Sequence, residues 1–434
     1  MIRFLKKQPA VRFITLGFLM VILIGSGLLM LPISIKDGMH VSYIDALYTS
    51  TSAVCVTGLI AIDTADYFTL FGQIVVCLLI QIGGLGVSAI GAWIILAISH
   101  KINLKEISIV KEALNLHSGH GMNSFLKELF LTTIIIETLG ALINFIVFIG
   151  DYSVGQAIWL SIFHSVASFN NSGFDAFGGG VGLTGYQDNI LLNINTSLLI
   201  ILGGLGFLVI RELRTKRFHW KRLSMHSRVV LTMSALLLFL GTILIKIAED
   251  SGITWLGAFF FSVSSRTAGF STFPVGNFRD VTLLVIIVLM FIGASPGSTG
   301  GGIKTTTFFV LLQGLKSSAT NRQEKAFHYS IPSGAFKKAS VLSFLAISLI
   351  VVSTFLMLMF EPHLSFLDCF FEMTSAFGTV GLSTGITPSL TVPSKLLSIL
   401  MMYIGRLGPL TIVTLWNFNR VERFSYPEGN ISIG

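Results

Sequence analysis

The chain has 434 residues, of which 12% are charged and 53% hydrophobic, and its mean hydropathy is +0.81. A soluble chain carries about 25% charged residues, so this composition excludes an ordinary soluble protein. The net charge of +8 does not indicate a nucleic-acid partner, because 22 of the 29 lysines and arginines lie in five clusters between apolar segments, at 3–12, 101–127, 211–228, 316–338 and 420–423. The three cysteines show no metal-ligand spacing and imply no disulfide framework.

Long apolar runs recur along the chain, and several reach the roughly 20 residues that a helix needs to cross about 30 Å of hydrocarbon. They occupy residues 11–31, 70–99, 126–150, 191–210, 229–248, 281–293, 341–360 and 396–416. We therefore predict an all-α polytopic membrane protein. The positive-inside rule places the five basic clusters in the cytoplasm, so both termini are expected there.

The same plan recurs four times between the basic clusters: a long apolar helix, a short semi-apolar helix, a turn of small residues and a second apolar run. The short helices and turns read YIDALYTSTSAVCVTGL, AIWLSIFHSVASFNNSGF, ITWLGAFFFSVSSRTAGF and FLDCFFEMTSAFGTVGL, and the turns contain Gly58, Gly173, Gly269 and Gly381. Internal self-similarity predicts repeated units that assemble together. The expected repeats are residues 1–100, 101–215, 216–320 and 321–420, followed by a cytoplasmic tail at 421–434.

Each short helix has about 12 residues and cannot span the bilayer, so we expect it to be re-entrant. The extended backbone after it cannot face lipid, because its N–H and C=O groups would be unpaired; it must lie inside protein or line a pore. Four such segments aim carbonyl oxygens at one axis, as the filter loops of potassium channels do. The alternative is that the small residues serve ordinary packing of membrane helices, which does not explain a glycine at the same offset four times.

These features together resemble the membrane subunit of the Ktr/Trk/HKT superfamily of potassium transporters, and within it the Ktr type. The resemblance rests on the four turns, on the interrupted second helix of the third repeat and on YIGRLGPLT at 403–411. It implies four pseudo-fourfold-related helix–pore helix–helix units around a central pore. The filter carbonyl groups are then expected from Val56, Thr57, Gly58, Asn171, Ser172, Gly173, Thr267, Ala268, Gly269, Thr379, Val380 and Gly381. It also implies potassium preference, because a serine at the position of Gly58 accompanies sodium preference in this family.

A glycine-rich stretch, SPGSTGGGIKTTT at 295–307, interrupts the second apolar run of the third repeat. It is not a Walker A loop, because Ile303 separates Gly302 from Lys304, so no nucleotide is expected on this chain. The resemblance implies an intramembrane gating loop at 293–307, expected in only one of the four second helices; the alternative is a glycine kink packed against a neighbouring helix. The expected gate residues are Gly297, Gly300, Gly301, Gly302, Lys304, Thr305 and Arg406.

Charged residues at membrane depth are costly and usually functional. The resemblance implies that Arg406 lies near the pore and the loop, as an electrostatic barrier or as a latch for the loop carbonyl groups, whereas Glu137 is expected to be a buried structural residue. Arg266 lies next to the filter, and two interpretations stay open: it turns toward an acid such as Asp175, or it lowers the occupancy of an ion site.

The resemblance implies a potassium-uptake subunit of the bacterial plasma membrane rather than an enzyme. K+ is the expected transported ion and Na+ a second candidate, as a coupled ion or as the main ion of a sodium-selective or non-selective transporter with the same fold. A membrane enzyme is the least favoured alternative. The expected partners are a second copy of the chain in a homodimer, membrane lipid and a cytosolic ring of nucleotide-binding RCK subunits (KtrA/KtrC-like) that controls the gate; no nucleic acid is expected.

Overall fold

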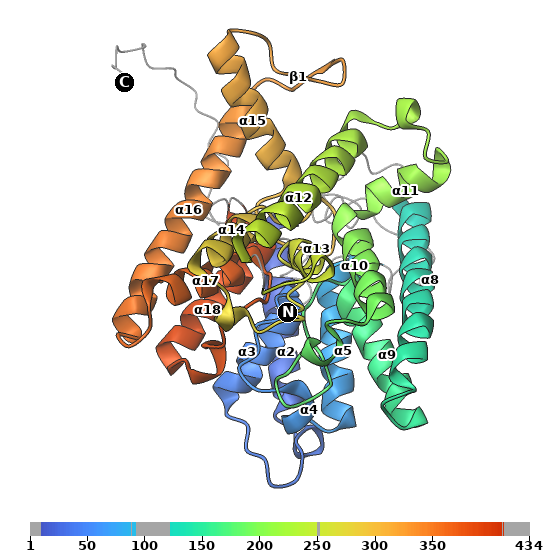
Figure 1. Cartoon of the computed structure of the whole chain (residues 1–434), viewed down its shortest axis with the longest axis vertical. Helices are drawn as coiled ribbons and strands as arrows, with labels where there is room; N and C mark the ends of the chain where they lie inside the picture. The colour runs from blue at the N-terminus through green and yellow to red at the C-terminus, as the bar shows by residue number, and fades with distance from the viewer. Residues whose placement is uncertain (1–9, 88, 93–121, 250–251, 410, 412–434) are drawn as a thin grey trace.

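The computed structural model describes residues 10–87, 89–92, 122–249, 252–409 and 411 (Figure 1). Three helices form the core of each repeat. They are α2 (Ala10–Leu29), α3 (Tyr43–Cys55) and α5 (Leu70–Leu85); α8 (Met122–Phe148), α9 (Val154–Phe169) and α10 (Ile190–Leu205); α12 (Met225–Glu249), α13 (Trp255–Ser264) and α14 (Asp280–Phe291); and α16 (Ala335–Phe360), α17 (Phe366–Gly378) and α18 (Val392–Leu407). The smaller elements are α4 (Thr64–Tyr67), α11 (Phe207–Thr215), α15 (Thr305–Thr320), the 3-10 helices η1 (Pro32–Ser34), η2 (Thr184–Tyr186), η3 (Trp220–Arg222), η4 (Val275–Asn277) and η5 (Thr387–Ser389), and an antiparallel hairpin of β1 (Lys325–Ala326) and β2 (Tyr329–Ser330).

The first helix of each repeat is long enough to cross a membrane. The apolar segments are Arg12–Leu29, Met122–Phe148, Met225–Glu249 and Ala335–Phe360. Their outer faces expose apolar side chains such as Leu139, Phe239 and Phe355, which a membrane helix presents to lipid. The chain is therefore an all-α multi-pass membrane protein, as predicted, apart from the small β1–β2 hairpin.

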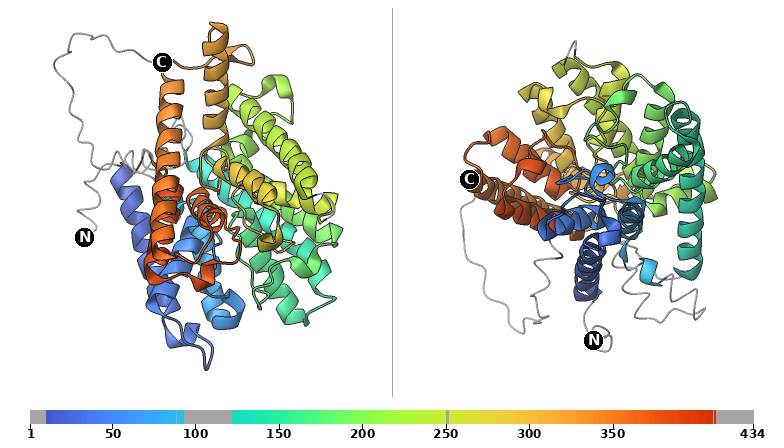
Figure 2. Two further views of the ribbon diagram at one scale, coloured as in Figure 1. Left: turned by 60° about the vertical axis from the view of Figure 1, so that its left-hand side comes forward. Right: turned by 90° about the horizontal axis from the view of Figure 1, so that it is seen from below.

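The four repeats follow one another around the molecule in chain order (Figure 2). Each short helix contacts the first long helix of its own repeat, and the second long helix of each repeat contacts the short helix of the next one. These second contacts join α5 to α9, α10 to α13, α14 to α17 and α18 to α3, so the last of them closes the ring. An ion pair of 2.7 Å between Lys395 on α18 and Asp45 on α3 strengthens this closing junction.

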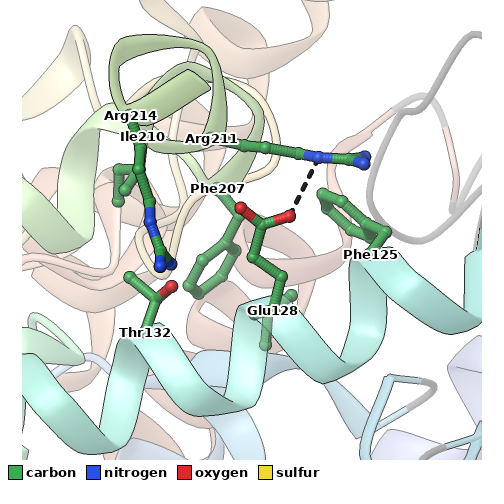
Figure 3. A pocket seen from close by; sticks show the side chains of 8 residues that line it. Phe125, Glu128, Thr132, Phe207, Ile210, Arg211 and Arg214 are labelled. Carbon is green, nitrogen blue, oxygen red and sulfur yellow. Dashed lines mark ion pairs between the residues drawn. The ribbon is translucent and has the colours of Figure 1, made fainter. Parts of the chain in front are cut away.

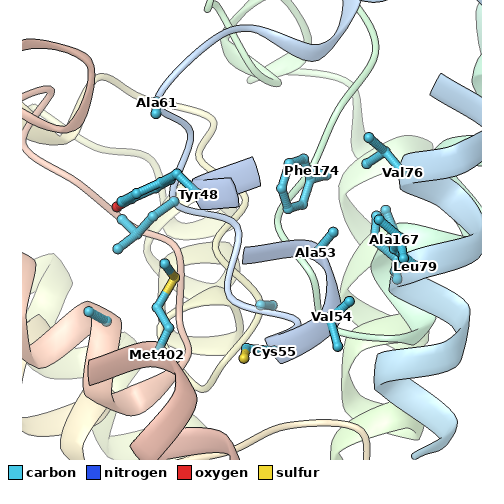
Figure 4. Packing of buried hydrophobic residues seen from close by; sticks show 14 of the residues in the cluster. Tyr48, Ala53, Val54, Cys55, Ala61, Val76, Leu79, Ala167, Phe174 and Met402 are labelled. Atoms are coloured by element: carbon cyan, nitrogen blue, oxygen red, sulfur yellow. The ribbon is translucent and has the colours of Figure 1, made fainter. Parts of the chain in front are cut away.

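The short helices lie inside the ring, and α3 shows why. All its residues from Tyr48 to Cys55 are buried, because α2, α5 and α18 surround it. Its side chains share one apolar cluster with Leu79 of α5 and Met402 of α18 (Figure 4). The hydroxyl groups of Tyr48 and Ser398 form a hydrogen bond of 3.0 Å, which satisfies both at this depth. A short helix that cannot span the membrane is thus held by neighbouring helices on several sides.

Serines fix the polar ends of two short helices. Ser42 accepts a hydrogen bond from the amide of Asp45 at 3.1 Å and donates its hydroxyl to the carboxylate of the same residue at 2.7 Å. Ser365 and Asp368 repeat this arrangement at the start of α17. The first turns of α3 and α17 therefore carry a carboxylate, which the positive end of a helix dipole favours, and their partially negative C-terminal ends point toward the turns.

Glycines set the distance between the short and long helices. In three repeats a serine of the short helix donates its hydroxyl to a carbonyl oxygen of the first helix. Three positions after the residue that accepts this bond, the first helix has a glycine, which leaves room for the serine. The bonds run from Ser50 to Ile22, Ser165 to Glu137 and Ser262 to Leu238, at 2.7, 2.7 and 2.9 Å, beside Gly25, Gly140 and Gly241. Small residues permit the same close approach in other membrane helix pairs.

The second helices use glycine for the same purpose. A Cβ atom at Gly83, Gly203 or Gly405 would overlap a backbone carbonyl of the short helix, that of Val54, Phe169 or Phe377 respectively. Only a hydrogen atom fits between these backbones, so the position tolerates no other residue without a shift of one helix.

The expectation that only one second helix is interrupted is wrong. The helices α5, α10 and α18 all stop at a glycine with the same backbone conformation: Gly86, Gly206 and Gly408 have φ of 89°, 91° and 89° and ψ of 129°, 141° and 137°. An α-helix needs φ near −63° and cannot continue through such a residue. After Gly206 the chain enters α11, which makes an angle of 98° with α10.

The third repeat differs in the length of its interruption. Residues 292–304 separate α14 from α15, whereas a single glycine ends the helix in the other repeats. The loop also ends earlier than predicted, because residues 305–307 form the first turn of α15. The sequence signal for the other three breaks is a second repeat, IGGLG at 82–86, LGGLG at 202–206 and IGRLG at 404–408.

Replacing Gly405 by alanine should destabilise the protein, because the new methyl group overlaps the carbonyl group of Phe377. Overpacking of this kind costs roughly 1–3 kcal/mol. Gly27→Ala is the matched control, since nothing lies within 4 Å of its Cβ position and alanine favours a helix by up to about 1 kcal/mol. The melting temperature in detergent should fall for Gly405→Ala only. Equal melting temperatures would contradict the close contact between α17 and α18.

Candidate ion pathway

The turns that follow the four short helices have the same backbone. The residue two positions before each turn glycine has positive φ: 57° at Val56, 58° at Asn171, 76° at Thr267 and 49° at Thr379. The glycines themselves have φ of 91°, 68°, 79° and 95°. Positive φ is unusual for any residue with a side chain and a genuine outlier for a β-branched one, as three of the four are. Four identical departures from ordinary geometry indicate that one function has shaped all four turns.

The four turn glycines meet in a closed ring. A Cβ atom on Gly58 would lie 2.8 Å from the Cα atom of Gly173, and the corresponding distances are 3.1 Å from Gly173 to Gly269, 3.0 Å from Gly269 to Gly381 and 2.9 Å from Gly381 back to Gly58. The nearest atom in each case is a carbonyl oxygen of the next turn, that of Ser172, Ala268, Val380 or Thr57. The structure thus brings together the four turn glycines and the carbonyl groups of the residues that precede them, which are eight of the twelve expected residues. Of the twelve, the eight that are not glycine have no exposed surface.

Hydrogen bonds hold the turns by their amide groups. The amide of Thr57 donates to the carbonyl oxygen of Ser52 at 2.8 Å, and the amide of Gly58 donates to the hydroxyl of the same serine at 3.0 Å. Ser375 binds Val380 and Gly381 in the same way, at 2.9 and 3.1 Å. The second and third repeats lack this serine, since alanine and valine occupy its position.

The carbonyl oxygens of these turns have no such partners. Within the residues that the structure describes, none of the twelve filter carbonyl groups accepts a hydrogen bond from a backbone or side-chain donor. A buried carbonyl without a partner is costly and rare in a native protein. Oxygen atoms that carry partial negative charge coordinate cations, so the chemistry of this ring suits a cation.

The glycine-rich loop is anchored to the second repeat. The amide of Ser295 donates to the carbonyl oxygen of Gly204 at 3.1 Å, and the amide of Phe207 donates to that of Gly297 at 3.0 Å. Thr299 adds a bond from its hydroxyl to the carbonyl oxygen of Phe169, at 3.3 Å. These contacts lie at the break between α10 and α11, so this glycine break and the loop form one structural unit.

The same loop packs directly against the filter turns of the third and fourth repeats. The amide of Gly301 donates to the hydroxyl of Thr379 at 3.1 Å, and a Cβ atom on Gly300 would overlap the hydroxyl of Thr267. Lys304 folds the loop back on itself by donating to the carbonyl oxygens of Gly300 and Gly301 at 2.7 and 3.3 Å.

Arg406 ties the loop to the first repeat. Its guanidinium donates to the carbonyl oxygens of Thr299, Gly83 and Gly84. It occupies the position that Gly84 and Gly204 occupy in the first two repeats, within the same five-residue pattern. The loop therefore contacts the second, third and fourth repeats next to the glycine ring, and Arg406 of the fourth repeat links it to the first.

The other residues that were expected to form a gate serve the shape of the loop. Gly297 and Gly302 have φ of 67° and 66°, which side chains rarely permit. The hydroxyl of Thr305 donates to that of Ser295 at 3.1 Å, where α15 begins. These contacts close the base of the loop.

Arg266 does not turn toward Asp175. Its side chain lines a small cavity between α10 and α12, and its guanidinium donates to the hydroxyl of Ser234 at 3.4 Å. Glu137 has the structural role that was expected: it accepts hydrogen bonds from the side-chain amides of Asn170 and Gln81, at 3.0 and 3.4 Å.

Three aspartates lie in the segments that follow the first and second turns. Asp63 and Asp66 accept hydrogen bonds from the amides of Gly180 and Gly179, each at 2.9 Å. Asp175 follows the second turn and is buried. Burial and the neighbouring Asp63 carboxylate raise the pKa of Asp175 to about 7. In the parts of the chain that the structure describes, no three His, Cys, Asp or Glu side chains gather into a metal cluster.

Comparison with known proteins adds to this geometry. A family profile described as "TrkH: Cation transport protein" matches residues 10–420. The potassium/sodium uptake protein NtpJ of Enterococcus hirae is 39% identical over 99% of this chain and 98% of its own length, and the Ktr system potassium uptake protein B of Bacillus subtilis is 37% identical over 97% and 96%. The crystal structure of the potassium transporter TrkH from Vibrio parahaemolyticus matches with a TM-score of 0.74 at 19% identity, covering 95% of this chain and 86% of that one, so the two share a fold.

Replacing Asp175 by asparagine should stabilise the protein more at pH 8 than at pH 5. The pKa of this carboxyl rises from 3.8 to about 7 on folding, so its contribution to stability is greatest at low pH and is lost as the pH rises through 7. The difference between the two pH values is on the order of 2 kcal/mol. Asparagine keeps an acceptor for the amide of Phe177, which Asp175 binds at 3.2 Å.

The measurement is the melting temperature in detergent at both pH values. The exposed Asp188→Asn is the control and should show no such dependence. A gain at Asp175→Asn that is equal at pH 5 and pH 8 would contradict the raised pKa.

Proposed function

Since the chain belongs to the TrkH family of cation transport proteins, we propose that it is the ion-translocating subunit of a Ktr-type potassium-uptake system in the bacterial plasma membrane. The observation that carries this proposal is the ring of buried carbonyl oxygens without hydrogen-bond donors. A dehydrated K+ ion supplies the missing partner, since carbonyl oxygens replace its hydration shell. The serine contacts at Gly58 and Gly381 keep the amide groups occupied, so that the oxygens alone face the ion.

Sodium is the second candidate ion. The printed name of the Enterococcus hirae relative includes both potassium and sodium. Glycine at all four turn positions favours potassium in this chain, because the ring then consists of backbone oxygens only. Uptake of K+ and Na+ into vesicles that contain the purified protein, each with the other ion absent or in excess, decides between the two and also reveals coupling. Saturable Na+ uptake that K+ does not inhibit would overturn the potassium proposal.

The loop at 292–304 is proposed as the gate. Its contacts with three repeats and its link through Arg406 to the first support a closed pathway, and the five glycines of the loop give it alternative conformations. We further propose that a cytosolic RCK ring with bound nucleotide moves the loop, that two copies of the chain form a homodimer and that both termini are cytoplasmic. The expected tail at 421–434 lies outside the described residues.

Gly381→Ser should reduce the preference for K+ over Na+. The new side chain overlaps the carbonyl oxygen of Thr57 and approaches the Cα atom of Gly58, so it displaces part of the ring. Gly385→Ser is the matched control, because Gly385 also has positive φ, 101°, but nothing lies within 4 Å of its Cβ position. The K+ to Na+ uptake ratio should fall about tenfold or more for Gly381→Ser, which corresponds to roughly 1.4 kcal/mol, and change little for the control. An unchanged ratio would remove Gly381 from the filter.

Deletion of Gly300–Gly302 should raise uptake in the absence of the cytosolic ring. The deletion removes the contacts of the loop with Thr267 and Thr379, so the loop no longer reaches the filter. Arg406→Gln should act on the same step, because it releases the loop from the first repeat. Lys395→Gln, which removes a cation at the other end of the same helix, is the control.

The readout is potassium uptake by cells that lack other potassium transporters, with and without the ring subunit. Well-expressed deletion variants that depend on the ring as strongly as the wild type would show that the loop is a packed kink rather than a gate.

A further inference from the structure

We propose that the groove between α8 and α11 binds the headgroup of an anionic phospholipid from the cytoplasmic leaflet, and that the bound lipid holds the glycine-rich loop in its observed position. The first statement concerns binding alone. The second rests on the proposed function of the loop as a gate.

The groove has an apolar floor and a basic rim. Phe125 and Leu129 of α8 line one side, and Phe207 and Ile210 of α11 line the other (Figure 3). The floor continues along α8 to Leu131 and Ile135, which are half exposed on the outside of the protein. An acyl chain fits such a surface, because burying its CH₂ groups removes apolar area from water.

The rim carries one guanidinium without a counter-charge. Arg211 pairs with Glu128 at 3.0 Å and lies 5.6 Å from the centre of the Phe125 ring, so its charge is compensated. Arg214 is exposed on the next turn, and its side chain extends along the groove toward Thr132 (Figure 3). Across the described ranges, no carboxylate pairs with Arg214. The groove therefore offers a positive charge beside an apolar surface, which is the complement of an anionic lipid.

The position in the fold favours a lipid over a soluble anion. The angle of 98° at Gly206 turns α11 away from the direction of the membrane span, beside the Met122 end of α8 (Figure 1). The chain that follows α11 exposes Phe218 and Trp220 among basic residues. Aromatic and basic side chains together mark the cytoplasmic membrane interface, where the lipid headgroups are anionic.

The groove and the loop share one residue. The ring of Phe207 lines the groove, and the amide of the same residue donates to the carbonyl oxygen of Gly297 at 3.0 Å. The preceding turn accepts two further loop amides, those of Ser295 and Thr299, at Gly204 and Gly203. A lipid that binds this arrangement stabilises it by linkage, and with it the closed loop.

Binding is tested on the full-length protein in detergent by native mass spectrometry, with phosphatidylglycerol and phosphatidylcholine of identical acyl chains. The wild type should retain phosphatidylglycerol in preference, and Arg214→Gln should lower that retention about fivefold. Arg222→Gln removes the same charge from the exposed η3 segment and should leave retention unchanged. An equal loss of phosphatidylglycerol retention in both variants would overturn the site. A wild type that retains the two lipids equally would also overturn it, and this is the result expected if another segment of the chain or a protein partner covers the groove.

The effect on the loop is tested by rubidium flux into vesicles of phosphatidylcholine with and without phosphatidylglycerol. Without the cytosolic ring, rubidium flux through the wild type and through Arg222→Gln should be lower in vesicles that contain phosphatidylglycerol than in vesicles that lack it. Rubidium flux through Arg214→Gln should be the same in both. A wild type that binds phosphatidylglycerol but conducts equally in both vesicles would refute the coupling. A wild type that binds it and conducts no rubidium under any condition would instead contradict the proposed potassium transport.

Discussion

The approach of backbones to within the space of a hydrogen atom is the constraint on which this structure depends. It operates between the four turn glycines and between Gly405 and the carbonyl group of Phe377 in the fourth repeat, and Gly241 makes similar room for the hydroxyl of Ser262 in the third. A side chain at any of these places would push the short helices outward and open the ring. The packing of helices and the geometry of the ion site are therefore one problem, solved by residues that have no Cβ atom.

Rigid and adaptable backbone lie side by side at the centre. The filter turns hold Val56, Thr267 and Thr379 at positive φ, which costs on the order of 1–3 kcal/mol for each residue and persists only in fixed surroundings. Burial and the hydrogen bonds from the amide groups provide those surroundings. The loop next to them is held by a few bonds to backbone oxygens and two cationic side chains, Lys304 and Arg406. The proposed function needs this contrast, since selection of an ion requires fixed distances and gating requires movement.

Much of this arrangement follows from the sequence because its signals are local and repeated. The length of the apolar runs gives the fold class, and the four turn glycines give the residues that meet at the axis. The glycine breaks at Gly86, Gly206 and Gly408 were not predicted, because a glycine in an apolar run is equally typical of a helix contact and of a helix end. The backbone angle φ of the glycine distinguishes the two, and the sequence does not specify this angle. The direction of Arg266 was open for a similar reason. It depends on the space between α10 and α12, helices that lie far from it along the chain.

The fusion of four repeats into one chain has an evolutionary consequence. The residues three positions before the turn glycines are Cys55, Asn170, Arg266 and Gly378, which share no chemistry, and in the described parts of the chain only the third repeat has a long interruption. In a tetramer of identical subunits every mutation alters all four quarters of the pore at once, and a segment that crosses the axis would collide with three copies of itself. Duplication within a single gene removes this coupling. Each quarter can then diverge on its own, so natural selection could install an asymmetric part at the centre of a symmetric pore without disturbing the other three walls.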